Sequence, residues 1–339
     1  MSNDTGMNRR QVLQTLGVGA AIPFLGHAAV AQTAGKKVNI VNTQGMATLT
    51  VQEVMKRRGF LQEFGVDPNI LYVADAAKLM GSLISGESDI CMFSGIGSVL
   101  TAIEKGGKIK LVAGSLVKLE HAVYSKRPNI KSVKDLEGKT IASGSTGSLT
   151  HVMMVALLRK YGVDEKKVTF VNVGGTPDIF KSVAAGIADA GISEIDVYNE
   201  QEKYGVHVLQ EGDLWKELPS FTFQGAYASE KAIREKRDAL VGTLAAYAKL
   251  YRFLSSVESE KMYVESQVAA ASRPVDESAR WQWKFFQQTQ IYATDLVLSE
   301  ERIKYMQDLN LSLGMQRKIV PYEEATDMSI ARDALKLLG

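Results

Sequence analysis

Cysteine and histidine are scarce in this sequence of 339 residues. The single cysteine, Cys91, can form neither an internal disulfide nor a cysteine-based metal cage, and the four scattered histidines do not match the His-Glu-x-x-His zinc motif. We therefore expect no metal site. Cys91 lies inside the apolar run 90–93, which predicts a buried thiol that fills the core.

A strong net charge is also missing. Forty Lys and Arg residues against thirty-eight Asp and Glu residues leave a formal charge of +2. No overall basic field exists to hold nucleic acid or an anionic membrane surface, so a small discrete ligand is the expected partner. The length allows two ordinary domains, and 45% apolar residues are enough to bury a sizeable core.

The first 31 residues predict an export signal. Arg9 and Arg10 precede an apolar stretch over 12–25, and residues 29–31 supply the small-x-small pattern that signal peptidase cleaves. The apolar stretch is shorter than the roughly 20 residues of a membrane span and is interrupted by glycine and proline. The match to a twin-arginine signal is partial, so Sec export stays open. Either route predicts cleavage near Ala31 and a periplasmic protein.

The rest of the chain contains an internal repeat. Residues 38–93 read as strand, helix, strand, helix and strand, and residues 140–192 repeat this order. Glycine closes many helices, so one shared glycine would carry little weight. We favour a true repeat because five positions recur at constant spacing in the helix before the last strand. The pairs are Leu79 with Ile179, Ser82 with Ser182, Leu83 with Val183, Gly86 with Gly186 and Asp89 with Asp189.

The repeated order predicts an α/β protein with two lobes, each a mostly parallel sheet flanked by helices. We expect lobe I over 36–117, lobe II over 118–224, and a helical return to lobe I over 225–339. Five further helices are expected in the return, and they should pack around the first lobe. Their ranges are 239–254, 263–271, 276–286, 298–309 and 322–338.

Ligands of such sheets bind beyond the carboxyl ends of the strands, where strand order reverses. The loops after the strands should therefore line a site between the lobes. Four loops qualify, two from each lobe, at 42–47, 94–98, 143–148 and 193–196.

Three segments, 135–141, 144–148 and 183–191, together with the export signal, resemble the solute-binding proteins of ABC importers. The branch that they resemble binds nitrate, sulfonates and taurine, and it also contains thiamine-precursor binders. The resemblance spans roughly residues 37–254. It implies a two-lobed periplasmic-binding-protein type II fold whose lobes close over a solute by a hinge motion.

The same resemblance implies hinge crossings near 116–120 and 221–227. It also implies a monomer that performs no catalysis, carries no cofactor and delivers its solute to an ABC permease in the inner membrane. The expected solute is a small organic anion such as a sulfonate or carboxylate, or nitrate. One alternative is a thiamine-precursor pyrimidine or another amine-bearing solute.

Two further alternatives belong to other classes of protein. One is a pyrimidine-synthase-like enzyme of this fold, which uses Lys-linked pyridoxal phosphate and its own histidine. Its cysteine-rich motif is absent, since Cys91 stands alone. The other is a ligand-sensing subunit that acts on a receptor. Gly138-Lys139-Thr140 imitates the end of a P-loop, but Val133 occupies the position of the required first glycine, so a P-loop is excluded.

The most polar candidate binding loop is the one over 143–148. Ser145, Thr146 and Ser148 stand where a helix begins, so their hydroxyls and the backbone N–H groups could cradle an oxyanion at the positive end of the helix dipole. Ordinary N-capping is the alternative role for these residues.

The first lobe offers matching loops. Thr43, Gln44 and Met46 follow the first strand, where Gln44 could donate to the solute and Met46 could pack on an apolar part of it. Ser94 and Gly95 precede another helix. For both loops the alternative is a solvated turn.

Glu194 and His121 are the candidate ionisable ligands. If Glu194 lines the site, it would repel an anion and favour a solute with an amine or amidine group; the alternative is a surface residue in an acidic run. His121 begins the strand after the first crossing and could reach the solute or be purely structural. We expect His151 in the core and leave His207 unassigned. The aromatic residues of 281–286 could stack on a ligand, but core packing is expected.

Overall fold

The computed structural model describes residues 36–43, 45–73, 76–272 and 274–339, all within one compact unit. The predicted export signal over 1–31 lies outside these residues. None of the helices in the described ranges is long and apolar enough to cross a membrane.

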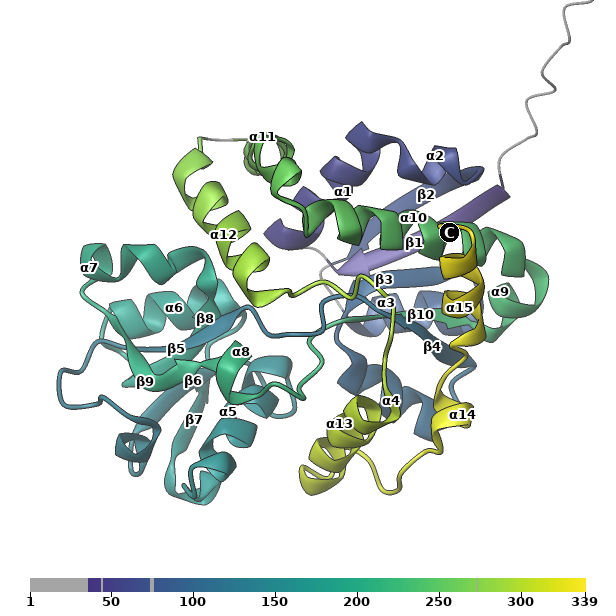
Figure 1. Cartoon of the computed structure of the whole chain (residues 1–339). Coiled ribbons are helices and arrows are strands. Elements are labelled where there is room, and N and C mark those ends of the chain that lie inside the picture. The colour runs from purple at the N-terminus through teal and green to yellow at the C-terminus, as the bar shows by residue number, and fades with distance from the viewer. Residues whose placement is uncertain (1–35, 44, 74–75, 273) are drawn as a thin grey trace, which may run out of the picture. The chain divides into compact units, whose positions relative to one another are not determined.

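The first sheet has five strands in the order β2-β1-β3-β10-β4 (Figure 1). Four of them come from the first part of the chain and run parallel, whereas β10 is antiparallel to both of its neighbours. Pro68 is tolerated in β2 because β2 is an edge strand. The strands are β1 (Lys36–Thr43), β2 (Val66–Val73), β3 (Ile90–Ser94), β4 (Ile109–Gly114) and β10 (Gly225–Ser229).

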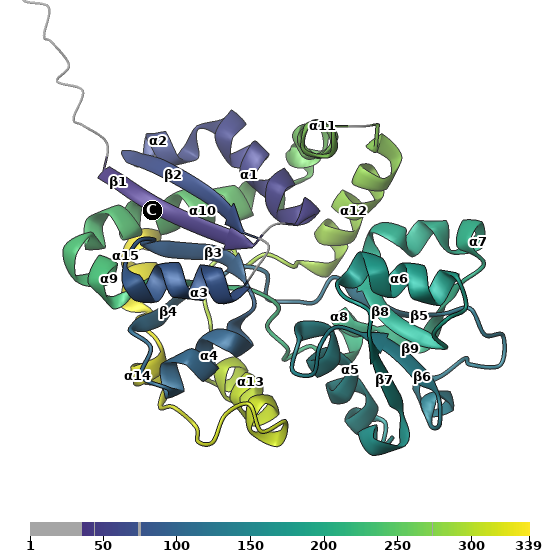
Figure 2. The same cartoon turned by 180° about the vertical axis from the view of Figure 1, so that it is seen from behind.

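The second sheet repeats this arrangement, in the order β7-β6-β8-β5-β9 (Figure 2). Here β5 is the antiparallel strand, and it occupies the place that β10 has in the first sheet. The predicted α/β class, with two mostly parallel sheets flanked by helices, is confirmed. The strands are β5 (His121–Ser125), β6 (Thr140–Ser143), β7 (Thr169–Asn172), β8 (Ala190–Glu194) and β9 (His207–Asp213).

The predicted sequence repeat is a repeat in structure. Asp89 accepts a hydrogen bond from the backbone N–H of Asn39 at 2.8 Å, and Asp189 accepts one from Thr140 at 2.9 Å. Each aspartate thereby fixes the first strand of its unit to the turn before the third. Gly86 and Gly186 have φ of 75° and 72°, a region that favours glycine. The glycine at the same position of each repeated unit therefore forms the same turn.

Helices of the two repeated units flank the sheets. The first unit contains α1 (Met46–Arg58), α2 (Phe60–Glu63), α3 (Ala76–Ser85) and α4 (Ile96–Glu104). The second contains α5 (Leu149–Lys160), α6 (Thr176–Ala184), α7 (Gln201–Tyr204) and α8 (Leu214–Glu217). Short 3₁₀ helices are η1 (Val133–Leu136), η2 (Glu165–Lys167), η3 (Ile195–Glu200) and, later in the chain, η4 (Val257–Ser259).

The C-terminal segment is helical, as predicted. It comprises α9 (Glu230–Glu235), α10 (Arg237–Leu254), α11 (Glu260–Ala271), α12 (Asp276–Thr289), α13 (Glu300–Ser312), α14 (Tyr322–Ala325) and α15 (Ser329–Lys336). The predicted single helix over 322–338 is wrong. The chain breaks after α14 because Thr326 bridges to Leu111 of β4 and the Asp327 N–H donates to the Leu111 carbonyl.

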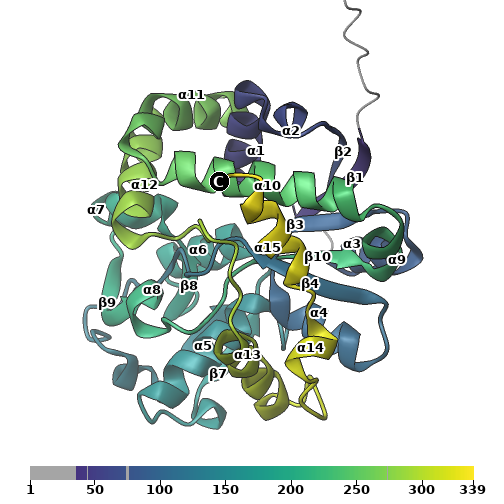
Figure 3. The same cartoon turned by 45° about the vertical axis from the view of Figure 1, so that its right-hand side comes forward.

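Most of these helices cover the first sheet or its helices: α10 lies against β1 and β2, α11 against α1, and α13 against α4. Helix α12 packs on α11 (Figure 3) and also contacts η3 beside the second sheet, so it is not confined to the first lobe. Aromatic contacts explain this position. Trp281 stacks on Tyr198 with ring centroids 5.4 Å apart, and Phe285 meets Trp215 edge to face at 4.8 Å.

The chain crosses between the sheets after β4 and again before β10. The two crossings lie side by side, because Ser115 N–H donates to the Gln224 carbonyl at 3.3 Å and Gln224 N–H donates to the Leu116 carbonyl at 2.9 Å. A third segment, which follows α12, joins them through the bond from Val117 N–H to the Ile291 carbonyl. The predicted second crossing at 221–227 extends too far, since residues 225–227 already belong to β10.

Candidate functional site

A cavity of about 500 Å³ lies where strand ends of both sheets meet. Its volume is in the range of small-molecule sites. Residues from both sheets, from the second crossing and from the C-terminal segment line it. They are Thr43, Ser94 to Ser98, His121, Gly144, Gly147 to Thr150, Val152, Gly174 to Thr176, Glu194, Phe221 to Gln224, Met306, Asn310 and Met315.

Most of the predicted site residues lie at this cavity. Those that line it are Thr43, Ser94, Gly95, His121, Ser148 and Glu194. Gln44 lies outside the described residues. Met46, Ser145 and Thr146 do not line the cavity; Met46 is half-buried at the start of α1, and the two hydroxyl residues are exposed. Whether any of these residues contacts a solute stays a prediction.

The loop before α5 shows why its tip turns away. Ser148 N–H donates to the Ser145 carbonyl at 2.8 Å, which closes a tight turn. Gly147, with φ of 80°, completes that turn, so Ser145 and Thr146 form an exposed tip. Gly144, Gly147 and Ser148 line the cavity instead.

Side chains of α5 already use two N–H groups of this loop. Gly144 N–H already donates to Thr150 Oγ1 at 3.0 Å, and Gly147 N–H donates to His151 Nδ1 at 3.2 Å. Ser148 caps α5 by accepting from His151 N–H, which is the N-capping alternative. The helix start is thus satisfied in part by its own side chains.

Glu194 ends β8 at the cavity wall. Its carboxylate accepts a hydrogen bond from Thr176 Oγ1 at 3.0 Å. Burial, followed by the charge of Asp196, raises the pKa of Glu194 to about 7. Glu194 is half-buried and lines the cavity, which argues against a fully solvated surface carboxylate.

His121 lies directly opposite Glu194 in the antiparallel pair of β5 and β8. It is buried, and its ring meets Phe223 edge to face at 5.0 Å. Burial lowers the pKa of His121 to about 3, so the ring is neutral at physiological pH. Nδ1 has no hydrogen-bond partner among the described residues, and the same holds for the fully buried Thr222 Oγ1.

A second buried carboxyl stands behind this pair. Glu120 precedes His121, is 4% exposed, and has one carboxyl oxygen without a partner in the described part of the chain. Burial, then the charges of Glu194 and Asp196, raise the pKa of Glu120 well above its ordinary value. Burial and mutual repulsion therefore favour the protonated forms of the carboxyl groups at this side of the cavity.

The residues that line the cavity carry little charge. None of the described residues that line the cavity is Lys or Arg, and Glu194 is the only acidic one. No group of three or more potential metal ligands occurs in the described ranges. The site is thus uncharged apart from a carboxyl group, with hydroxyls, glycines and apolar side chains around it.

His151, His207, Cys91 and three aromatic residues of α12 lie outside the cavity lining. His151 and Cys91 are buried, and His207 Nε2 lies 2.7 Å from the Ile130 carbonyl. Trp283, Phe285 and Phe286 are buried in the core, as expected. Cys91 is 0% exposed, which confirms its predicted burial.

Several lining residues were not predicted from the sequence. Gly174 to Thr176 follow β7, so the strand-end rule alone could have found them. Met306, Asn310 and Met315 come from the C-terminal segment, where no local pattern marks them. They reach the cavity only because α13 packs on α4, where Asn310 Nδ2 donates to the Gly97 carbonyl at 2.9 Å.

Comparison with known proteins places the chain in a family. Residues 48–256, more than half of the chain, match the model of the family described as NMT1/THI5 like. The chain belongs to the NMT1/THI5-like family. YtlA of Bacillus subtilis (strain 168) is 22% identical over 289 residues, which cover 82% of this chain and 84% of that protein.

Solved structures show the same architecture. The alkanesulfonate-binding protein SsuA from Xanthomonas axonopodis pv. citri, bound to MOPS, is 17% identical with a TM-score of 0.68, covering 86% of this chain and 98% of that one. The periplasmic nitrate-binding protein NrtA from Synechocystis PCC 6803 is 12% identical with a TM-score of 0.70, covering 90% and 89%.

The desulfurization enzyme DSZB is similar too, at 12% identity and a TM-score of 0.62, covering 89% of this chain and all of that one. The chain thus has the periplasmic binding protein fold, as the resemblance implied. The fold is shared by binding proteins and by at least one enzyme, so the site must decide the function.

Proposed function

We propose that this protein is the exported solute-binding component of an ABC importer. It binds one small organic solute in the cavity between the two sheets and performs no covalent chemistry on it. The observation that carries the proposal is the cavity itself. It is formed from both sheets, and Glu194, His121 and Thr222 bring unsatisfied or weakly satisfied polar groups to its wall.

The chemistry of the wall favours one class of solute. Glu194 and neutral His121 can both accept hydrogen bonds, and no lining Lys or Arg is available among the described residues to neutralise an anion. A sulfonate or nitrate beside the ionised form of Glu194 would be strongly unfavourable. The solute we propose therefore carries N–H donors, as an amine, amidine or aminopyrimidine does. Of the predicted classes, this favours the amine-bearing alternative over the organic anion.

An enzyme of the pyrimidine-synthase kind receives less support. Such an enzyme would need a lysine in the cavity to carry pyridoxal phosphate, and the described lining contains none. The purified protein should be colourless above 320 nm, whereas a lysine-linked Schiff base would absorb there.

Export and closure complete the proposal. The N-terminal signal pattern and the periplasmic location named for SsuA of Escherichia coli and for NrtA support a periplasmic protein. The paired crossings at 115–117 and 224 would form the hinge on which lobe I (36–117 and 225–339) and lobe II (118–224) close. The closed monomer would then dock on an inner-membrane permease.

A thermal-shift comparison tests the solute class. Benzamidine and benzenesulfonate share a ring and differ in the sign of their charge, and 4-aminopyrimidine adds a neutral N–H donor. We expect benzamidine or 4-aminopyrimidine to raise Tm by mass action and benzenesulfonate and nitrate to leave it unchanged. The gain should vanish in Glu194→Gln and persist in Glu202→Gln, whose carboxylate is exposed. A Tm gain from benzenesulfonate alone would restore the anion hypothesis.

A further inference from the structure

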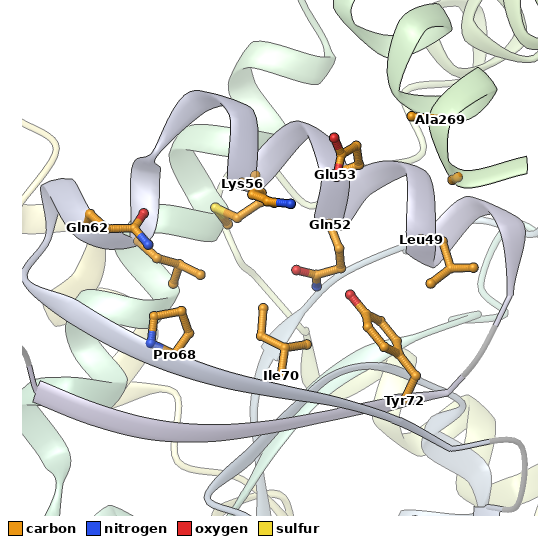
Figure 4. Close-up of a pocket in the computed structure, with 12 residues that line it drawn as sticks. Leu49, Gln52, Glu53, Lys56, Gln62, Pro68, Ile70, Tyr72 and Ala269 are labelled. Atoms are coloured by element: carbon orange, nitrogen blue, oxygen red, sulfur yellow. The ribbon is translucent and has the colours of Figure 1, made fainter. Parts of the chain in front are cut away.

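We propose a second ligand site, separate from the cavity between the sheets. It lies between α1, the edge strand β2 and α11, and it binds a small uncharged molecule that has an apolar body and one hydroxyl group (Figure 4). The pocket measures about 420 Å³ and shares no lining residue with the cavity between the sheets.

The alternation of β2 builds one wall of this pocket. Successive side chains of a strand point to opposite faces, so Pro68, Ile70 and Tyr72 share the face toward α1. Figure 4 shows the three side chains rising from the strand toward the helix. Leu49, in the first turn of α1, closes the same side. The body of a ligand would thus contact mainly carbon atoms.

Gln52 supplies the polar contact. It is only 5% exposed and points from α1 into the space above Ile70 and Tyr72 (Figure 4). Its Nε2 donates to the Tyr247 hydroxyl at 2.5 Å, while Oε1 has no partner among the described residues. A buried amide end without a partner costs about 1 to 3 kcal/mol, so a ligand that satisfies it gains that energy.

A hydroxyl group suits this amide in either orientation. If the amide is turned over, Oε1 accepts from Tyr247 and Nε2 becomes the end without a partner. A hydroxyl can donate to Oε1 and can equally accept from Nε2. A carboxylate or an ammonium group could serve only one of the two orientations.

The charges at the pocket favour a neutral ligand. Glu53 and Lys56 contribute one charge of each sign, and Glu53 is already paired with Arg57 at 2.8 Å. Burial, followed by the charge of Glu53, raises the pKa of Tyr72, so its hydroxyl stays protonated. A cation thus meets no unpaired carboxylate here, and the charges of Glu53 and Lys56 cancel in the lining, although Lys56 has no ion pair among the described residues.

The pair p-cresol and toluene tests the assignment, because the two differ only in the hydroxyl group. The intact protein, labelled with ¹⁵N, is titrated with each compound, and the side-chain NH₂ signal of Gln52 is identified by its loss in Gln52→Leu. We expect p-cresol to shift that signal and to bind about 10-fold more tightly than toluene, as one hydrogen bond of about 1.4 kcal/mol requires.

Two variants test whether p-cresol binds in this pocket and not elsewhere on the protein. Gln52→Leu should weaken p-cresol about 10-fold, to the affinity of toluene, while the exposed control Gln210→Leu leaves it unchanged. Ala269→Trp, at an exposed position of α11 beside the pocket, should block both compounds without disturbing the core.

Three results would overturn the proposal: no shift of the Gln52 signal, equal affinities for p-cresol and toluene, or undiminished p-cresol binding in Ala269→Trp. Glu194→Gln, which alters only the cavity between the sheets, should bind p-cresol like the parent protein. Loss of p-cresol binding in that variant would place the probe in the other cavity and also refute the second site. A failure of the solute proposal leaves these outcomes unaffected.

Discussion

At the scale of single residues, the pair of His121 and Glu194 governs the chemistry of the cavity. The two stand opposite each other on neighbouring antiparallel strands, where side chains on one face approach closely. Burial acts on them in opposite directions: it keeps His121 neutral and makes Glu194 reluctant to ionise. Both can therefore be uncharged acceptors or donors in the unliganded protein at neutral pH.

Glu194 should make stability fall as pH rises. Its pKa is about 4.5 in the unfolded chain and about 7 when folded, so the folded state binds the extra proton between these values. Stability therefore decreases from pH 4.5 to pH 7 by on the order of 2 kcal/mol through this group. Glu194→Gln should remove that loss, and urea unfolding between pH 5 and pH 8 measures it.

The comparison with Glu194→Gln also separates the effect of His121. Its lowered pKa acts with the opposite sign, because stability from a neutral buried histidine rises as pH increases from about 3 to 6.5. That contribution is common to both proteins and cancels in their difference. Glu202→Gln serves as the exposed control. If the free energies of the parent and Glu194→Gln run parallel across this range, Glu194 is ionised throughout and its assignment is wrong.

At the scale of elements, the two repeated units share one set of contacts made by an aspartate. Asp89 and Asp189 each accept from a strand N–H and from a cation: Lys236 Nζ lies 2.7 Å from Asp89 and Arg127 Nε lies 3.0 Å from Asp189. The pKa of Asp189 is lowered mainly by the hydrogen bond from Thr140. In each unit the aspartate joins the turn after one helix to a strand that lies about 50 residues earlier in the chain.

Removal of either aspartate should destabilise the protein by a similar amount. We expect Asp89→Ala and Asp189→Ala each to reduce the free energy of unfolding by about 2 kcal/mol, since each leaves a strand N–H without its charged acceptor. Asp178→Ala is the matched control, because its pair with Lys181 is exposed and should contribute less than about 0.5 kcal/mol. Urea denaturation measures all three. A loss below 0.5 kcal/mol in Asp189→Ala would contradict the proposed role.

The elements were largely predictable because strand and helix periods and glycine turns are local signals. The strand ends at Thr43, Ser94 and Glu194 followed from the order of the elements. The position of α12 was not predictable, because its contact with Tyr198 depends on packing between distant segments. The orientation of the loop tip at Ser145 was equally hidden, since it depends on the side chains that satisfy the glycine N–H groups.

At the scale of the whole molecule, two of the three tryptophans lie at the contact between α12 and the second half of the molecule. Trp281 stacks on Tyr198, and Trp215 meets Phe285, so two tryptophans lie where the two halves touch. Trp283 instead is buried and donates to Ser259 at 2.9 Å within the C-terminal helices. A hinge motion would move the first two relative to each other and leave the third in place.

Solute-driven closure should therefore change the tryptophan emission. With a solute that raises Tm, we expect an intensity or wavelength change that is strongly reduced in Trp281→Phe and in Trp215→Phe. Trp283→Phe, the control, should retain it. A change that disappears only in Trp283→Phe would show that the C-terminal helices rearrange and that the contact with the second sheet does not.

The late position of β10 in the chain has a consequence for biosynthesis. All strands of the second sheet come from one continuous stretch, His121 to Asp213, so that sheet can pair as soon as this stretch has left the ribosome. The first sheet has to wait for β10, which is made after the second sheet is complete. The half of the molecule that is translated first thus completes its sheet last, and strand edges of that sheet stay unpaired in the interval.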